Sequence, residues 1–343
     1  MLIFAGIGLS GPGSITKEVE GVIHSADQIY VERYTSPMDA QFFQDLAVEE
    51  VDREFVEDGL ALLEMASNKT VVLLCYGDPM VATTHAELRV RAENRGIRTK
   101  VLHNASILSS LPGGTGLHSY KFGRSVTATI GTDPAALSLY YSLHSNLVNG
   151  LHTPILLDYN LRENKHLTPN RAITALLERE EEQRKAVFNL DSLVIIVSRM
   201  GSVHEEIVGG SARSLKDQDF GDPPYVLILP GKLHFTEEEF LRTILKVKNG
   251  FVRDNSDDVQ LQITSMLEKY IPKATEALRR ARQKIDLEAK PKFNPLLTNV
   301  EAYILDAERF KNDGRFELAV LSVGYAEGLL DALRFLGELE VEW

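Results

Sequence analysis

The sequence predicts two α/β domains followed by a small all-helical domain. Through its first 110 residues, short apolar runs alternate with stretches that carry an apolar residue every three or four positions. This alternation is typical of a parallel sheet covered by helices. A second series of apolar runs follows between residues 125 and 231, and after about residue 258 only helical periodicity remains. We therefore expect domains at 1–112, 113–247 and 258–343.

The first expected domain has four buried strands in a doubly wound arrangement. The strands are predicted at 2–8, 27–32, 70–75 and 99–104. The helices are predicted at 14–26, 51–67 and 86–96. In such sheets ligands bind at the carboxyl ends of the strands, so the turns that follow the strands are the candidate sites.

A proline- and glycine-rich stretch, LPGGTGLHSYKFG (111–123), is predicted to be the break between the two α/β domains. The strands expected after it lie at 125–131, 152–159, 192–200 and 224–231, with a helix over 170–187. The segment KNGFVRDNSDD (248–258) has no apolar periodicity and is predicted to be a linker. The helices expected beyond it lie at 263–281, with a bend at Pro272, at 300–310 and at 315–337.

Composition excludes several classes of function. The net charge of −12 argues against a non-specific nucleic-acid binder, because phosphate binding needs a basic face. A single cysteine, Cys75, excludes a disulfide framework and a four-thiolate zinc site. The apolar opening lacks the basic region of a signal peptide, and no run approaches the roughly 20 apolar residues that span a bilayer. We expect a cytosolic protein without nucleic acid, membrane or metal as a partner.

The glycine-rich turn GIGLSGPGSIT follows the first predicted strand. Glycines there let the backbone approach a ligand, and a dinucleotide such as NAD is one candidate. Glu32, at the end of the second strand, stands where such a site would hold a ribose. Pro12, however, removes a backbone N–H that a pyrophosphate-binding loop needs. The turn alone leaves the ligand open.

A second turn, CYGDPMVATTH (75–85), ends the third apolar run. Its Asp78 is placed to accept hydrogen bonds from a ligand's hydroxyl or amine groups, and it would favour a nearby sulfonium electrostatically. The alternative is that Asp78 only caps the following helix. Three histidines of this region are expected to be hydrogen-bonded structural residues, because no metal-ligand spacing accompanies them: His85, His103 and His118.

Eight motifs then occur in a fixed order: GIGLSGPGSIT, YTSP, GDPMVATTH, HNASI, GLHSYKFG, NGLHTPILLDY, SRMGS and GDPPYVLILPGKLHFTEEEFL. Together they make residues 1 to about 245 similar to the diphthine synthases, the diphthamide-pathway branch of the tetrapyrrole (precorrin-type) methylase superfamily. GDPMVATTH, HNASI and YKFG distinguish this branch from the corrin-ring methylases, which share mainly the two turns.

The resemblance implies two α/β domains of the tetrapyrrole methylase type, with S-adenosylmethionine in the cleft between them, and a homodimer. The positions that line the cofactor site in the family correspond here to Leu9, Asp78, Val81, Ser106, Ile107, Leu157, Met200 and Tyr225. Several act through main-chain atoms, and Tyr225 stands where the family has a histidine, in GDPPH. No residue is identified as a catalytic acid or base.

The resemblance also implies the substrate. This is translation elongation factor 2 bearing a histidine extended with a 3-amino-3-carboxypropyl group, whose amine is methylated repeatedly. The tail resembles a small helical domain of unknown function found in archaeal proteins, and archaeal-type members stop at the trimethylated product. Two alternatives stay open: a methyltransferase of the same superfamily acting on a corrin intermediate, and a non-catalytic cofactor-binding protein whose helical tail contacts a partner.

Overall fold

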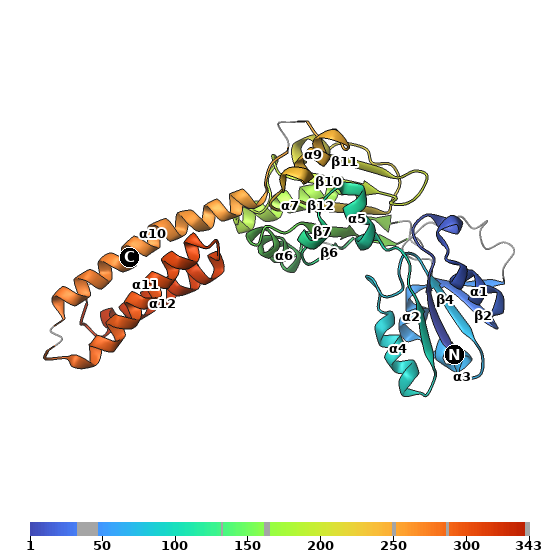
Figure 1. Cartoon of the computed structure of the whole chain (residues 1–343), viewed down its shortest axis with the longest axis horizontal. Coiled ribbons are helices and arrows are strands. Elements are labelled where there is room, and N and C mark those ends of the chain that lie inside the picture. The colour runs from blue at the N-terminus through green and yellow to red at the C-terminus, as the bar shows by residue number, and fades with distance from the viewer. Residues whose placement is uncertain (33–46, 132, 161–164, 249–251, 286–287, 340–343) are drawn as a thin grey trace. The chain divides into compact units, whose positions relative to one another are not determined.

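The computed structural model describes residues 1–32, 47–131, 133–160, 165–248, 252–285 and 288–339 (Figure 1). The chain forms two compact units, Met1–Asn255 and Ser256–Trp343. The first unit holds two five-stranded sheets with their helices, and the second is helical. The expected α/β fold with a helical C-terminal part is therefore confirmed. The predicted boundary between the two α/β domains stays a prediction.

The first sheet is entirely parallel and has the strand order β3-β2-β4-β1-β5. Its strands are β1 (Leu2–Gly6), β2 (Gln28–Glu32), β3 (Val48–Val51), β4 (Val71–Cys75) and β5 (Thr99–Leu102). Its helices are α1 (Lys17–Ser25), α2 (Arg53–Asp58), α3 (Leu60–Asn68) and α4 (His85–Asn94). Strands β1 and β4 are buried throughout, since core clusters cover both faces of the sheet.

The prediction of one helix over 51–67 is wrong. Strand β3 ends at Val51, and Asp52 caps α2 by accepting a hydrogen bond from the backbone N–H of Phe55 at 2.7 Å. Gly59 then ends α2 with φ of 62°, in the left-handed region, before α3 begins. A Cβ at Gly59 would lie 2.5 Å from Leu88 Cδ1, so this break depends on glycine for space as well as for conformation.

The second sheet is mixed, with the order β11-β10-β12-β7-β6 and only the β6–β7 pair parallel. Its strands are β6 (Val126–Ala128), β7 (Thr153–Leu157), β10 (Leu193–Ser198), β11 (Glu206–Ser211) and β12 (Tyr225–Leu229). A two-stranded ribbon of β8 (Tyr159–Asn160) and β9 (Lys165–His166) follows β7. The helices of this part are α5 (Ile107–Thr115), α6 (Leu137–Val148), α7 (Pro169–Gln183), α8 (Ala212–Leu215) and α9 (Phe235–Thr243).

The predicted break at 111–123 begins inside a helix. Ser106 and Ser109 form a capping box that starts α5, and Pro112 is accommodated within it. Gly116, with φ of 73°, ends the helix by donating to the Pro112 carbonyl at 2.9 Å. Proline and glycine therefore mark the end of α5 and not a domain break as such.

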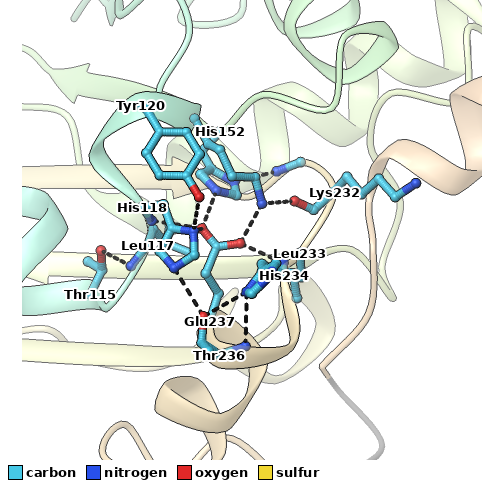
Figure 2. Close-up of polar contacts among 12 residues, drawn as sticks. Thr115, Leu117, His118, Tyr120, His152, Lys232, Leu233, His234, Thr236 and Glu237 are labelled. Carbon is cyan, nitrogen blue, oxygen red and sulfur yellow. Dashed lines mark hydrogen bonds and ion pairs between the residues drawn. The ribbon is translucent and has the colours of Figure 1, made fainter.

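Three of the motifs meet on one buried carboxylate, Glu237, at the edge where β7 begins and β12 ends (Figure 2). Its Oε1 accepts hydrogen bonds from the backbone N–H of His118 at 2.7 Å and from His152 Nε2 at 3.0 Å. Its Oε2 accepts from the backbone N–H of His234 at 2.7 Å and from Lys121 Nζ. The Glu237 carboxylate thus joins GLHSYKFG, NGLHTP and GKLHFTEEEF.

The charge states in this network follow from its hydrogen bonds. His152 Nδ1 accepts from the backbone N–H of Gly231 at 3.0 Å, so the proton on Nε2 is the one donated to Glu237. Burial lowers the pKa of His152 although the neighbouring carboxylate acts to raise it. The lowered pKa keeps the ring neutral. Burial alone would raise the pKa of Glu237, but the bonds from His152, the His118 amide and Lys121 outweigh it and hold that pKa well below its usual range.

The second unit consists of α10 (Ser256–Lys284), the short 3-10 helix η5 (Pro291–Phe293), α11 (Asn294–Asn312) and α12 (Phe316–Phe335). Its core includes alanines on all three long helices, which let the helices approach closely: Ala274, Ala277, Ala281, Ala307, Ala319 and Ala326. Gly314, with φ of 70°, makes the turn between α11 and α12 where KNDG predicts one. Within the described residues, no helix is long and apolar enough to cross a membrane.

The predicted linker at 248–258 is partly wrong, because its end is built into the structure. Asn255 is buried, accepts from the backbone N–H of Leu193, and donates to the carbonyls of Leu193 and Pro230, each at 2.8 Å. Helix α10 begins at the next residue. Asn255 therefore fastens the end of the first unit to β10 and to the end of β12.

We expect Asn255→Ala to lower the free energy of unfolding by at least about 2 kcal/mol, because it leaves buried backbone groups unpaired. Urea denaturation measures this. Asn149→Ala, at an exposed helix end, is the matched control and should change stability by less than about 0.5 kcal/mol.

A chain truncated after Asn255 keeps all three bonds and should unfold cooperatively. An insoluble truncated chain would contradict the division into two units.

We expect Glu237→Gln to cost about 3 kcal/mol of stability near neutral pH, since it removes one partner of a buried pair. The pKa of Glu237 is depressed in the folded state, so its contribution is present above the unfolded value of about 4.3 and is lost as the pH falls. The gap between the wild type and this variant should therefore narrow below about pH 4. Glu239→Gln, exposed on the same helix, is the control. A gap that stays constant down to pH 3 would contradict the ionised state.

Candidate functional site

The turns after β1 and β4 are joined by a reciprocal pair of backbone hydrogen bonds. The N–H of Gly8 donates to the Gly77 carbonyl at 3.2 Å, and the N–H of Gly77 donates to the Gly8 carbonyl at 3.0 Å. Both glycines have positive φ, 72° and 69°. A Cβ at Gly8 would lie 2.7 Å from Ser14 Oγ. The two turns predicted from the sequence therefore form one continuous backbone surface.

Asn104, in the motif HNASI after β5, holds the glycine turn through two side-chain hydrogen bonds. Its Nδ2 donates to the carbonyl of Gly6 at 3.0 Å and to that of Ser14 at 2.9 Å. Ser14 Oγ in turn lies 2.7 Å from the carbonyl oxygens of Ile7 and Gly11. Sequence reasoning missed Asn104 as a site residue. The available signal was its position directly after a strand at the edge where the turns gather.

Asp78 is buried and ties the second turn to the end of β5. Its Oδ1 accepts from the backbone N–H of Met80 at 2.8 Å, and its Oδ2 accepts from His103 Nδ1 at 2.8 Å and from the backbone N–H of Asn104 at 3.2 Å. The alternative that Asp78 caps α4 is wrong, because the N-cap residue of that helix is Thr84. Three of roughly four lone-pair positions of the carboxylate are used.

Beneath this turn, His85 donates from Nδ1 to the Pro79 carbonyl at 2.8 Å, and Thr83 Oγ1 donates to the same oxygen at 2.6 Å. His85 Nε2 lies 3.2 Å from Glu32 Oε2, and both side chains are buried. His85 is thus the structural histidine that was expected. Glu32, the candidate ribose ligand of a dinucleotide site, faces His85 inside the protein, which argues against NAD.

Cys75, at the end of β4, is buried. Burial raises the pKa of its thiol well above the usual range, and the charges of Glu32 and Asp78 add to the increase. The thiol therefore stays protonated and is no nucleophile.

The N-terminus of α5 lies against both turns. A Cβ built on Gly77 would lie 3.5 Å from the Cα of Ser106 and 3.8 Å from Leu9 Cδ2. Ile107, the first residue of α5, packs together with Met200 against the core of the second sheet. Helix α5 therefore connects the turns of the first sheet to the second sheet.

Leu157, Met200 and Tyr225 lie at one edge of the second sheet. Tyr225 pairs with Ser198, two residues before Met200, and Leu157 follows the last residue of β7 that pairs with β12. Gly201, with φ of 81°, abuts the glycine turn, because its Cβ would lie 2.8 Å from that of Leu9. This edge and the turns of the first sheet therefore meet at Leu9.

Val81, the last of the eight residues predicted to line a cofactor, lies in the second turn. Its N–H donates to the Asp78 carbonyl at 3.3 Å. The eight residues predicted to line a cofactor thus fall into two adjoining groups. The turns and the α5 N-terminus supply Leu9, Asp78, Val81, Ser106 and Ile107, and the second sheet supplies Leu157, Met200 and Tyr225. Their contact with a cofactor stays a prediction. In the described part of the chain, no cluster of histidine, cysteine and carboxylate side chains is arranged to hold a metal.

Comparison with known proteins agrees with this architecture. The family model of the tetrapyrrole (corrin/porphyrin) methylases matches residues 1–216, and that of a protein family of unknown function (DUF357) matches residues 269–339. A diphthine synthase of Methanosphaera stadtmanae is 36% identical over 262 residues, covering 74% of this chain and 99% of that protein. One of Methanocella arvoryzae is 38% identical over 259 residues, covering 73% and 100%.

A solved crystal structure of diphthine synthase superposes with a TM-score of 0.65 at 32% identity, covering 72% of this chain and 96% of that one. The likeness spans nearly the whole length of these proteins. The chain therefore belongs to the tetrapyrrole methylase family, in its diphthine synthase branch, and carries a DUF357-type helical unit at its C-terminal end.

Proposed function

We propose that this protein is an S-adenosylmethionine-dependent methyltransferase of diphthamide biosynthesis. It methylates the amine of the 3-amino-3-carboxypropyl-histidine of translation elongation factor 2, repeatedly and at one nitrogen. The observation that carries the proposal is the Gly8–Gly77 bridge, which forms a backbone surface at the edge of the first sheet and meets the second sheet at Leu9. Relatives named diphthine synthase, matched over nearly their full length, support the substrate.

The residues present fit this cofactor. A Cβ built on Gly11 or Gly13 meets nothing within 4 Å, so the backbone of the glycine turn is open to a ligand. Asp78 keeps capacity for one further donor, such as a hydroxyl or an amine. Leu157 and Tyr225 are a buried aliphatic and a buried aromatic side chain at the adjoining edge of the second sheet, which suits a flat base. The polar turns suit the amino-acid and ribose portion, and the second-sheet residues suit adenine.

When bound, S-adenosylmethionine supplies an activated methyl group. The amine ordinarily carries a proton at neutral pH, by analogy with lysine, and must lose it before each transfer. Cys75 stays a protonated thiol, so covalent catalysis through it is ruled out. The contribution of the chain is to fix the donor and the amine in line and to exclude water.

The alternatives have less support. Glu32 faces His85 and is not presented to a ribose, which disfavours NAD. The relatives named above are diphthine synthases and not corrin methylases. We propose a cytosolic homodimer, because elongation factor 2 acts in the cytosol and the family resemblance implies a dimer.

We expect S-adenosylhomocysteine to bind the full chain in calorimetry and NAD not to bind. Asp78→Ala should weaken this binding by about tenfold or more, because it releases the second turn from β5, and it should also lower the melting temperature. Asp217→Ala, at an exposed carboxylate, is the control. An unchanged affinity combined with a lower melting temperature would show that Asp78 acts only on stability.

We expect mass spectrometry of elongation factor 2 that bears the unmethylated intermediate to reveal a gain of three methyl groups. The intermediate is incubated with the protein and S-adenosylmethionine, and the product should resist mild base because no ester forms. Elongation factor 2 without the extended histidine is the control and should gain none. A fourth, base-labile methyl would indicate the eukaryotic type of product, and methylation of a corrin alone would overturn the substrate.

A further inference from the structure

His166 lies beside the second-sheet part of the candidate site, although no motif drew attention to it. It pairs with Tyr159 across the β8–β9 ribbon, which begins two residues after Leu157. Its ring centroid is 6.0 Å from that of Tyr225 and 6.4 Å from that of Tyr159, with interplanar angles of 55° and 70°. The imidazole therefore packs between two tyrosine rings at the edge that carries Leu157 and Tyr225.

One ring nitrogen of His166 is not used by the described part of the protein. Its Nδ1 is buried and has no hydrogen-bond partner there. An unpaired buried nitrogen costs about 1–3 kcal/mol, and such groups call for an explanation. A hydrogen-bonding group of a ligand would satisfy this nitrogen.

The polar groups of Tyr225 and Arg199, beside His166, are already engaged in hydrogen bonds within the protein. The hydroxyl of Tyr225 donates to the Gly221 carbonyl and is therefore not available to a ligand, and its ring is buried against that of His166. Arg199, close to Tyr225, donates from Nε to the His204 carbonyl at 2.9 Å and from Nη1 to the Phe220 carbonyl at 3.0 Å. Leu157 is an aliphatic side chain. His166 thus carries an unused hydrogen-bonding nitrogen beside residues whose polar groups are engaged or absent.

We propose that His166 recognises the adenine ring of the methyl donor by hydrogen bonding, at the edge of the second sheet that carries Tyr225 and Leu157. This assignment rests on the proposed function. A neutral imidazole offers one N–H donor and one acceptor. The assignment puts the proton on Nε2, so that Nδ1, the buried nitrogen without a partner, accepts a hydrogen bond from the amino group of adenine. The polar turns around Asp78 then remain for the ribose and the amino-acid end.

The test is calorimetry on the full chain with two ligands, S-adenosylhomocysteine and S-inosylhomocysteine. The second carries a carbonyl oxygen where adenine has its amino group. The wild type should prefer the adenine ligand. His166→Phe keeps a ring but removes the nitrogens, so it should bind S-adenosylhomocysteine about tenfold more weakly and lose most of the preference. His166→Gln keeps a donor and an acceptor and should retain the preference.

His24→Phe, on exposed α1, is the control and should change neither affinity. The ratio of the two affinities does not depend on the folded fraction, so a partly unfolded variant still gives a result. If His166→Phe weakens both ligands by the same factor, or neither, the assignment is overturned and the proposed function stands. If the wild type binds neither ligand, both are overturned.

Discussion

The Gly8–Gly77 backbone pair is the interaction on which the candidate site depends. It fixes the carboxyl ends of β1 and β4 against each other. Two further contacts at that edge support it, because Asn104 holds the glycine turn and Asp78 ties the second turn to β5. This surface is made of backbone atoms. It therefore depends on the identity of the glycines and of the polar side chains that support them, and less on the side chains that would face a ligand.

The residues at the two ends of the strands of the second sheet have different roles. Leu157 and Tyr225 lie at the edge that meets the glycine turn, whereas His152 and Gly231 lie at the opposite ends of the same strands. A five-residue strand spans roughly 16 Å, so the Glu237 network is remote from the candidate site. Its contribution is to position elements. The amide of His118, which Glu237 binds, follows the end of α5, whose N-terminus presents Ser106 and Ile107.

The parts of the fold that the sequence predicts are those that depend on local pattern. Strands β1, β4, β10 and β12 are continuous apolar runs, so each was located to within a few residues. Strand β3 was missed because VEEV is half acidic, and β11 because EIVGGS ends in small residues. Helix α5 was missed because its last turn contains PGGT, a sequence that favours a loop. In each case a tertiary contact overrides a weak local preference.

The candidate site divides in the same way. Its two turns were recognisable as glycine-rich ends of strands, and the family resemblance located the eight lining residues. The role of Glu237 was not predictable, because its partners His118 and His152 lie 119 and 85 residues away. His166 was missed for a related reason. It reaches Tyr225 only because β8 and β9 form a ribbon, and nothing in KHLTP indicates that pairing.

The position of His166 also bears on the departure from the family motif at Tyr225. The family has histidine in GDPPH, and this chain has Tyr225 there, with its hydroxyl bound to Gly221. A tyrosine so engaged cannot supply the donor and acceptor pair of an imidazole. The ribbon brings an imidazole to the same place from β9, against the ring of Tyr225. Under the proposal for His166, an imidazole remains at this edge although another strand provides it. The assignment of the chain to its branch rests on likeness over nearly the whole length of its relatives, and it does not depend on the side chain at this one position.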